Sequence, residues 1–217
     1  MFGVEGNITL TPQNKQFLID SKAGGVLLMS RNITNETQLK TLIEEIQTTN
    51  TIPLFISIDQ EGGVVSRIKW NPTLTIPQSS ITTPEEAYTV AKDKGNILKT
   101  YGINMNLAPV VEYSTKPNSF IYNRKFRGSI DDVVNKSIAA VDGYTDVNVI
   151  PVLKHYPGHG DTLTDPHYKL PRVNITNEQW EGYTETFRRV IAEGKTDAVM
   201  IGHILFPNID AKPSSIS

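Results

Sequence analysis

Residues 54–63 read Leu-Phe-Ile-Ser-Ile-Asp-Gln-Glu-Gly-Gly, and this stretch decides the class of fold. An uncharged run rich in β-forming residues ends at the acidic Asp59, and two glycines that permit a tight turn follow. Parallel strands that are buried on both faces have apolar runs of this kind. We therefore expect a parallel strand over Leu54–Asp59 with polar side chains at its carboxyl end.

Similar apolar runs recur along the chain. Together they predict strands at Phe2–Glu5, Gly25–Met29, Leu54–Asp59, Ile103–Ala108, Val149–Lys154 and Ala198–Ile201. Longer helical patterns separate these runs, and such alternation is typical of βα units on a parallel sheet. Periodicity alone fits both a closed parallel barrel and an open doubly wound sheet.

The helices between these strands have clear start signals, because a side-chain oxygen before the first turn satisfies a free backbone N–H. These signals place helix starts at Thr11, Thr83, Ser129 and Thr176. Another helix is expected after Thr34, ending near Asn50. Its apolar residues fall on one side, as expected for a helix that packs on a sheet: Leu39, Leu42, Ile43 and Ile46.

Composition excludes several classes of protein. The chain has 217 residues, of which 38% are hydrophobic and 20% charged, so we expect one domain over residues 1–217 with a sizeable core. A net charge of −2 without long charged runs gives no sign of a nucleic-acid or membrane partner. No stretch has the length of a membrane span and no leader pattern opens the chain, so a soluble, cytoplasmic protein is expected.

Cofactor motifs are also missing from the sequence. Gly158-His159-Gly160 lacks the third glycine of the dinucleotide fingerprint, and no Gly-Lys-Ser/Thr loop occurs. Cysteine is absent, which rules out disulfides and thiol ligands. We therefore predict no cofactor, and small neutral ligands remain open.

Polar residues gather after three of the predicted strands. They form the groups Asp59–Gly63 and Lys154–Asp161, and His203 follows the last strand. All 4 histidines lie in the last two groups or in the loop between them: His155, His159, His167 and His203. The carboxyl ends of the strands hold the active site in a (β/α) barrel, so these groups are the candidate site.

Two residues near the first group each have two interpretations. Asp59 either accepts hydrogen bonds from a ligand such as a sugar, or caps a helix or pairs with a cation, because a lone buried carboxylate is costly. Arg67 either faces the same ligand or is a solvated surface charge.

The loop after the fifth predicted strand is rich in groups that can do chemistry. For His159 we favour a packed, hydrogen-bonded histidine over a catalyst. His167 differs, because Asp165 lies two residues before it and Pro166 biases Asp165 to an extended conformation. A carboxylate beside an imidazole fixes its tautomer and favours the imidazolium, which makes the histidine a usable general acid and base.

A metal site is a competing interpretation for this loop. His155, His159 and Asp161 are ligand types that hold zinc or iron. However, Lys154 would repel a cation, and Pro157–Gly158 would break the helix on which the two histidines would converge. We therefore predict no metal.

The motifs taken together resemble glycoside hydrolase family 3, and within it the bacterial β-N-acetylglucosaminidases. They occur in the family's order over nearly the whole chain: Ile58–Gly63 with Arg67, Asn106–Val110, Arg124–Phe126, Lys154–Asp161, Asp165–His167 and Met200–His203. An ordered set of this kind is hard to produce by chance, unlike any one of its members.

This resemblance implies a fold and a reaction. The fold would be an incomplete TIM-type (β/α) barrel with about six of its eight βα units. The reaction would remove terminal N-acetylglucosamine from cell-wall-derived or chitin-like saccharides by a retaining mechanism. His167 would be the acid/base and Asp165 its partner. The residues implied to bind the sugar are Asp59, Arg67, Arg124, Lys154 and His155.

The sequence also departs from the family pattern. Pro166 stands where a serine is common, and Val64 stands where an arginine often follows the two glycines. The family's nucleophile follows a seventh strand, and the chain stops at Ser217, so we expect a fragment that is catalytically silent on its own. A carbohydrate-binding remnant and a phosphorylase of the same family remain open alternatives.

Overall fold

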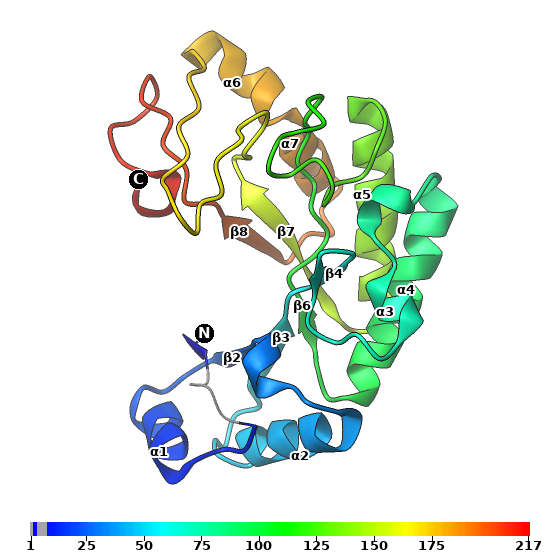
Figure 1. Ribbon diagram of the computed structural model, residues 1–217, viewed down its shortest axis with the longest axis vertical. Helices are drawn as coiled ribbons and strands as arrows, with labels where there is room; N and C mark the ends of the chain where they lie inside the picture. The colour runs from blue at the N-terminus through cyan, green and yellow to red at the C-terminus, as the bar shows by residue number, and fades with distance from the viewer. Residues whose placement is uncertain (1, 4–7) are drawn as a thin grey trace.

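The computed structural model describes residues 2–3 and 8–217. One sheet of 6 strands has the order β1-β2-β3-β6-β7-β8. Its strands are Phe2–Gly3, Gly25–Leu28, Phe55–Ile58, Met105–Asn106, Ile150–Tyr156 and Ala198–Ile201. Every neighbouring pair in this sheet is parallel. The sheet curves into a half-barrel with the helices on its outer side, which confirms the predicted incomplete (β/α) barrel (Figure 1).

The helices follow the strands in the expected alternation. Their bounds are α1 Pro12–Asp20, α2 Glu36–Gln47, α3 Pro72–Thr75, α4 Pro84–Thr100, α5 Ile130–Thr145, α6 Asn177–Tyr183 and α7 Glu185–Ala192. Short 3₁₀ turns are η1 Ser30–Asn32, η2 Gln78–Ser80 and η3 Ser214–Ile216. A separate antiparallel hairpin joins β4 Gln60–Gly62 to β5 Val65–Ser66. No helix within residues 2–3 and 8–217 is long and apolar enough to cross a membrane.

Most strands are shorter than the apolar runs that predict them. Glu5, the end of the first predicted strand, lies outside the described residues. β3 ends at Ile58 because the chain turns at Asp59 into the β4–β5 hairpin. β7 is longer than predicted and reaches Tyr156, because it continues to pair with β8 through an irregularity after Lys154. Strand ends thus follow from neighbouring strands rather than from hydrophobicity.

All four predicted helix starts at Thr11, Thr83, Ser129 and Thr176 have side-chain caps. The hydroxyl of Thr11 accepts from the N–H of Asn14 at 3.1 Å, and that of Thr83 accepts from Glu86 at 3.2 Å. Ser129 and Asp132 cap each other reciprocally at the start of α5. At the start of α6 the backbone N–H of Thr176 donates to the side chain of Gln179 at 2.9 Å. Side-chain caps therefore define where these helices begin.

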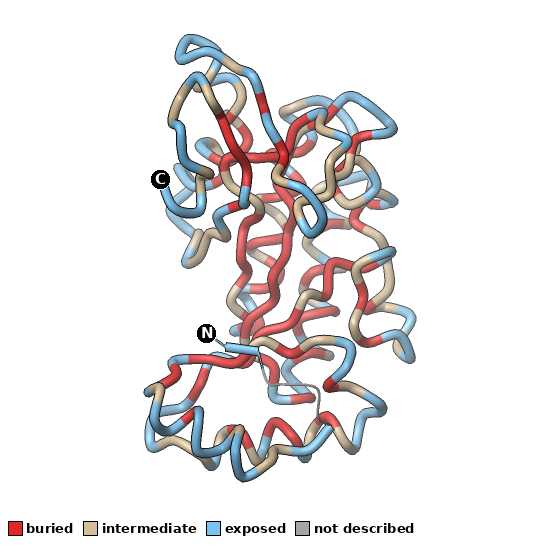
Figure 2. Tube along the Cα trace, turned by 60° about the vertical axis from the view of Figure 1, so that its left-hand side comes forward, coloured by how far each residue is buried: buried red, intermediate tan, exposed pale blue. Residues whose placement is uncertain are grey.

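The helix predicted after Thr34 is α2, which begins at Glu36 as expected and ends before the predicted end near Asn50. Asn35 is its N-cap, because its side-chain oxygen accepts from the N–H of Gln38 at 3.0 Å, and α2 ends at Gln47. Its predicted apolar face is confirmed, since the four residues are almost fully buried: Leu39, Leu42, Ile43 and Ile46. Buried positions run along the strands and the inner sides of the helices (Figure 2).

The helices α4 and α5 pack in close contact. A Cβ atom added at Gly143 of α5 would lie 2.4 Å from the carbonyl oxygen of Tyr88 and 3.0 Å from the Cβ of Ala91, both in α4. Glycine is therefore required sterically here, because a larger residue would separate the two helix backbones. This packing supports β6 and β7, which position the candidate site.

Candidate active site

Side chains from the carboxyl ends of several strands surround one cavity of about 670 Å³. The predicted site residues that line it are Asp59, Arg67, Arg124, His155, Asp165 and His167. Asp59 follows β3, His155 lies in β7, and Arg124 belongs to the segment between β6 and α5. The structure therefore brings together residues that are far apart in the chain. Val64 and Pro166, which depart from the family pattern, also line the cavity.

Asp59 is both an ion-paired carboxylate and a lining residue of the cavity. The Lys154 ammonium donates to it at 2.6 Å and the Arg67 guanidinium at 3.1 Å. Burial opposes ionisation of Asp59, but these two cations outweigh burial and hold the pKa of its carboxyl below the usual value. Asp59 is therefore a fixed anion with hydrogen-bonding capacity toward the cavity.

Glu61 is a second buried carboxylate of the site, with 3% of its surface exposed. Arg124 donates to it through Nε at 3.0 Å and Nη2 at 2.7 Å, and Lys154 Nζ lies 2.5 Å away. Burial again opposes ionisation, and Lys154 and Arg124 outweigh it, so the pKa of Glu61 is lowered. The bidentate contact between Arg124 and Glu61 fixes the plane of the guanidinium.

Lys154 supports the site from behind the cavity wall. Its side chain is 1% exposed, and its ammonium lies between Asp59 and Glu61. In this structure it therefore orients the carboxylates and does not itself line the cavity.

Glu112 anchors two histidines at the base of the cavity. Its Oε1 accepts from the backbone N–H of His155 at 3.1 Å and lies 2.6 Å from Nδ1 of that ring. Its Oε2 accepts from the backbone N–H of His159 and lies 3.1 Å from Nδ1 of that ring. Burial disfavours the charge, but the side chains of His159 and His155 outweigh it, so the pKa of Glu112 is far below its usual range. The packed interpretation of His159 agrees with this arrangement.

The metal-ligand group considered from the sequence does not form. The Asp161 carboxylate accepts from the Ser114 hydroxyl at 2.7 Å and the Thr115 N–H at 3.1 Å, and it does not belong to the cluster of possible ligands formed by the two histidines. Glu112 takes the place expected for Asp161, and its ligand atoms with those of His155 and His159 all lie within 4.8 Å of one another. Each Glu112 oxygen already accepts a backbone N–H, so a metal ion would have to displace the imidazole contacts.

Asp165 and His167 form a pair at the edge of the cavity. Asp165 Oδ1 lies 2.6 Å from His167 Nδ1 and accepts from the backbone N–H of His167 at 2.9 Å. The His167 side chain is 78% exposed, so its Nε2 can reach a ligand. His203 also lines the cavity, and its Nδ1 lies 2.5 Å from the Ser215 hydroxyl.

Two carboxylates of the site, Glu61 and Glu112, were missed as functional residues by the sequence reasoning. Glu61 lies in the quoted stretch, but only its partners, which come from distant segments, distinguish it from a turn residue. Glu112 follows the buried run Leu107–Val111. The argument used for Asp59, a charge at the end of an apolar strand, was applicable to Glu112 as well.

Comparisons with known proteins agree with this fold. Residues 4–217 match the N-terminal domain of glycosyl hydrolase family 3. The chain belongs to this family. A family 3 relative, the β-hexosaminidase of Thiobacillus denitrificans, is 30% identical over 217 residues, which are 96% of this chain and 60% of that protein. The chain thus spans well under two thirds of that relative's length.

Solved structures of family 3 proteins have the same fold. NagZ from Neisseria gonorrhoeae superposes with a TM-score of 0.91 at 29% identity, covering 100% of this chain and 67% of that one. The same protein in complex with N-trifluoroacetyl-D-glucosamine superposes with a TM-score of 0.88 at 28% identity and the same coverage. The half-barrel described here therefore corresponds to part of each of these solved structures.

Proposed function

We propose that this chain is the sugar-binding and acid/base part of a family 3 β-N-acetylglucosaminidase. The complete enzyme would remove terminal N-acetylglucosamine from cell-wall-derived or chitin-like saccharides. The observation that carries the proposal is the single cavity in which Asp59, Arg124 and His155 meet the Asp165–His167 pair.

Sugar binding is assigned to the residues whose positions are fixed by buried ion pairs. Asp59, Arg67 and Arg124 offer charged hydrogen-bonding groups to the cavity. Lys154 holds Asp59, Asp59 holds Arg67, and Glu61 holds Arg124. Charge-assisted bonds with a fixed direction suit the recognition of hydroxyl groups. The complex of the N. gonorrhoeae relative with a glucosamine derivative supports the same class of ligand.

His167 is assigned as the general acid and base, with Asp165 as its partner. An ionised Asp165 accepts a hydrogen bond from Nδ1–H and stabilises the imidazolium, and the Nε2–H of that imidazolium can then protonate the departing glycosidic oxygen. In a retaining mechanism a carboxylate attacks the anomeric carbon at the same step, and the neutral histidine then removes a proton from the water that attacks the glycosyl-enzyme. We assign the nucleophile to none of the residues 1–217.

Sugar binding and turnover by the same chain test this function. Calorimetric titration with N-acetylglucosamine should show binding, and Asp59→Asn should weaken it about tenfold or more, because an anion in the cavity is lost. Asp93→Asn, which changes an exposed carboxylate of α4, is the matched control. Absence of binding at saturating sugar would contradict the proposal.

Turnover separates the remaining possibilities. An aryl N-acetylglucosaminide should be bound but not cleaved by the chain alone. Cleavage that is lost in His167→Ala, but retained in the neighbouring Tyr168→Ala, would support His167 and place the nucleophile within the chain. A sugar 1-phosphate formed only with inorganic phosphate would instead show a phosphorylase.

A further inference from the structure

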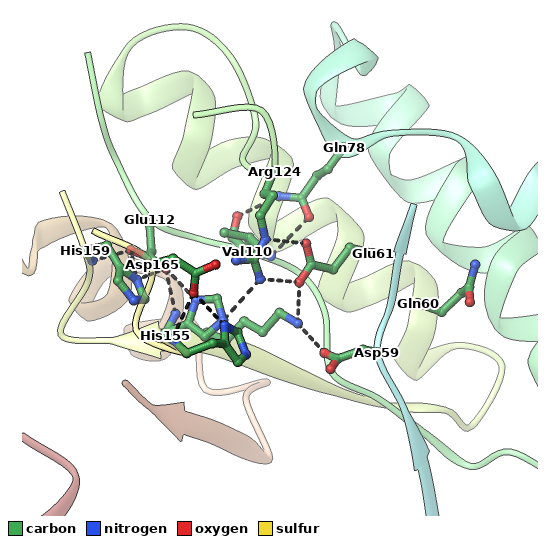
Figure 3. Close-up of polar contacts among 12 residues, drawn as sticks. Asp59, Gln60, Glu61, Gln78, Val110, Glu112, Arg124, His155, His159 and Asp165 are labelled. Carbon is green, nitrogen blue, oxygen red and sulfur yellow. Dashed lines mark hydrogen bonds and ion pairs between the residues drawn. The ribbon is translucent and has the colours of Figure 1, made fainter. Parts of the chain in front are cut away.

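His155 lies between two partners of opposite hydrogen-bonding character. Its Nδ1 is 2.6 Å from Oε1 of Glu112, and its Nε2 is 3.3 Å from Nη2 of Arg124 (Figure 3). A carboxylate that is ionised has acceptors alone, and a guanidinium has donors alone. The two contacts are therefore compatible with one arrangement of the ring: a proton on Nδ1 and a lone pair on Nε2.

We propose that Glu112 and Arg124 hold His155 in the neutral Nδ1–H tautomer, so that its Nε2 accepts a hydrogen bond from a hydroxyl group of the bound sugar. Glu112 is then a positioning residue, since it acts through His155 and does not touch the ligand. What is new is the direction of the hydrogen bond between His155 and the sugar: the sugar hydroxyl donates and Nε2 accepts. His155 would select a ligand group that donates, and would reject one that only accepts.

The ionised state of Glu112 follows from its surroundings. The side chain is fully buried, and its two oxygens accept from the backbone N–H groups of His155 and His159 as well as from both rings. Such a set of donors stabilises the anion and leaves the carboxylate no need for a proton. The Nδ1 atom of His155 is therefore the donor in this contact.

The neutral state of His155 follows from its burial and from the cations beside it. Burial is the largest effect and lowers the pKa of the ring, and it outweighs Glu112, which acts in the opposite direction. Lys154 and Arg124 lower the pKa further, and a second proton on Nε2 would face the Arg124 guanidinium. The neutral ring is therefore favoured although a carboxylate lies beside Nδ1.

The lone pair on Nε2 remains available to a ligand. Arg124 is held by Glu61 through bonds of 3.0 and 2.7 Å, whereas its contact with Nε2 is long at 3.3 Å. A hydroxyl group can thus replace the long contact while Arg124 keeps its place. The His155 side chain is 14% exposed and lines the cavity, so a ligand can reach it.

His159 provides an internal comparison. Its Nδ1 contacts the same carboxylate, but the residue is 1% exposed, and its Nε2 has no hydrogen-bond partner among the described residues. We expect the same tautomer for His159 and no response of its Nε2 to a sugar. The ring of His155 therefore faces the ligand, whereas the ring of His159 has a structural role.

The tautomer is read directly by NMR of the chain labelled with ¹⁵N-histidine. With 4 histidines, each signal can be assigned from one His→Gln variant. A long-range ¹H–¹⁵N correlation near neutral pH should show His155 Nε2 as an unprotonated nitrogen and Nδ1 as protonated. This test needs no ligand. In the free protein, a protonated Nε2 or an average of the two tautomers would overturn the proposal.

Substitution of Glu112 tests its role as the positioning residue. In Glu112→Gln the amide group must direct N–H donors at groups that are themselves donors, so His155 should lose the single Nδ1–H form and show a mixture of tautomers. Glu44→Gln, an exposed glutamate of α2, should leave all histidine signals unchanged. An unchanged His155 tautomer in a folded Glu112→Gln protein would remove Glu112 from this role.

The ligand half of the inference rests on the proposed function and is tested separately. Added N-acetylglucosamine should shift His155 Nε2 upfield while it stays unprotonated, and leave His159 Nε2 in place. Among monodeoxyfluoro analogues, which replace a donor by an acceptor, one should lose this shift and bind about tenfold more weakly. Sugar binding that leaves Nε2 unmoved would overturn the inference. If the chain bound no sugar at all, the proposed function and the hydrogen bond from the sugar to His155 would both be refuted. The tautomer of His155 would still be tested by the NMR spectrum of the free protein.

Discussion

Glu61 connects the two cations that shape the cavity. It binds Arg124 with two bonds and also contacts Lys154, which in turn holds Asp59. Acidic and basic groups therefore alternate along one series of contacts, in the order Glu112, Arg124, Glu61, Lys154, Asp59 and Arg67, with the neutral His155 between the first two. Buried charges persist in a protein when each one has such a partner.

Replacing Glu61 should disrupt this alternation. Glu61→Gln keeps the shape of the side chain but leaves Arg124 and Lys154 short of one anion, so we expect a loss of about 3 kcal/mol in the free energy of unfolding. Urea denaturation measures this loss, and calorimetry should show weaker N-acetylglucosamine binding. Glu44→Gln on the exposed side of α2 should stay within about 0.5 kcal/mol of the parent. Equal stability of both variants would show that Glu61 is not needed as an anion.

Lys94 in α4 holds the hairpin that carries Glu61. Its buried ammonium donates to the carbonyl oxygens of Glu61 at 2.8 Å and Ile76 at 2.7 Å. Burial outweighs the attraction of Glu61 and lowers the pKa of Lys94 to about 7, from 10.5 for a free lysine. Between these two pH values the unfolded chain binds more protons, so this lysine makes the protein more stable as pH rises from about 7 to 10.5.

Lys94→Met should remove that dependence. The variant should be less stable than the parent by roughly 1–3 kcal/mol for each unsatisfied carbonyl, and the difference should grow from about pH 7 to about pH 10. Urea denaturation of both proteins across this range is the measurement. A difference that is constant with pH would mean that Lys94 keeps its ordinary pKa in the folded protein.

At the scale of elements, helices were easier to predict than strands. Caps such as Thr83 and Ser129 are local signals, since their partners lie three residues away. Strand ends depend on ladders between distant segments, so β6 is reduced to Met105–Asn106 within a longer apolar run. The same reason explains the site: the Asp165–His167 pair was readable from the sequence, whereas the contacts of Glu112 with His155 cross 43 residues.

The packing of α4 on α5 predicts the effect of a single methyl group. Gly143→Ala places a Cβ atom 2.4 Å from the Tyr88 carbonyl oxygen, so the helices must move apart, at a cost of about 1–3 kcal/mol in unfolding free energy. Gly182→Ala is the matched control in α6, because a Cβ there meets nothing within 4 Å. Alanine favours helix over glycine, so this control should gain up to about 1 kcal/mol. Thermal unfolding compares the two, and a neutral Gly143→Ala would contradict the close contact.

At the scale of the whole molecule, the half-barrel places its buried charges at one end of the sheet. The carboxyls of Asp59, Glu61 and Glu112 all have pKa values below the usual range. Each one binds fewer protons in the folded than in the unfolded chain, so its stabilising effect is present above its ordinary pKa and is lost as pH falls. The lowered pKa of His155 acts in the same direction below 6.5, the pKa of a free histidine.

Acid should therefore destabilise the protein through the site. We expect the free energy of unfolding to fall from about pH 7 to about pH 3, and below about pH 5, where glutamate takes up a proton in the unfolded chain, Glu112→Gln should show a smaller slope than the parent because one such group is removed. Urea denaturation at several pH values gives both slopes. Equal slopes for the two proteins would mean that Glu112 is not an anion in the folded state.

A crystal structure of the chain with N-acetylglucosamine tests the central claim most directly, namely that strand-end residues distant in sequence form one sugar site. We predict the sugar in the cavity lined by Asp59, Arg124 and His155, with one hydroxyl oxygen within about 3 Å of His155 Nε2 and Nε2 of His167 turned toward the anomeric oxygen. A sugar bound on another face, with this cavity empty at saturating concentration, would contradict the account.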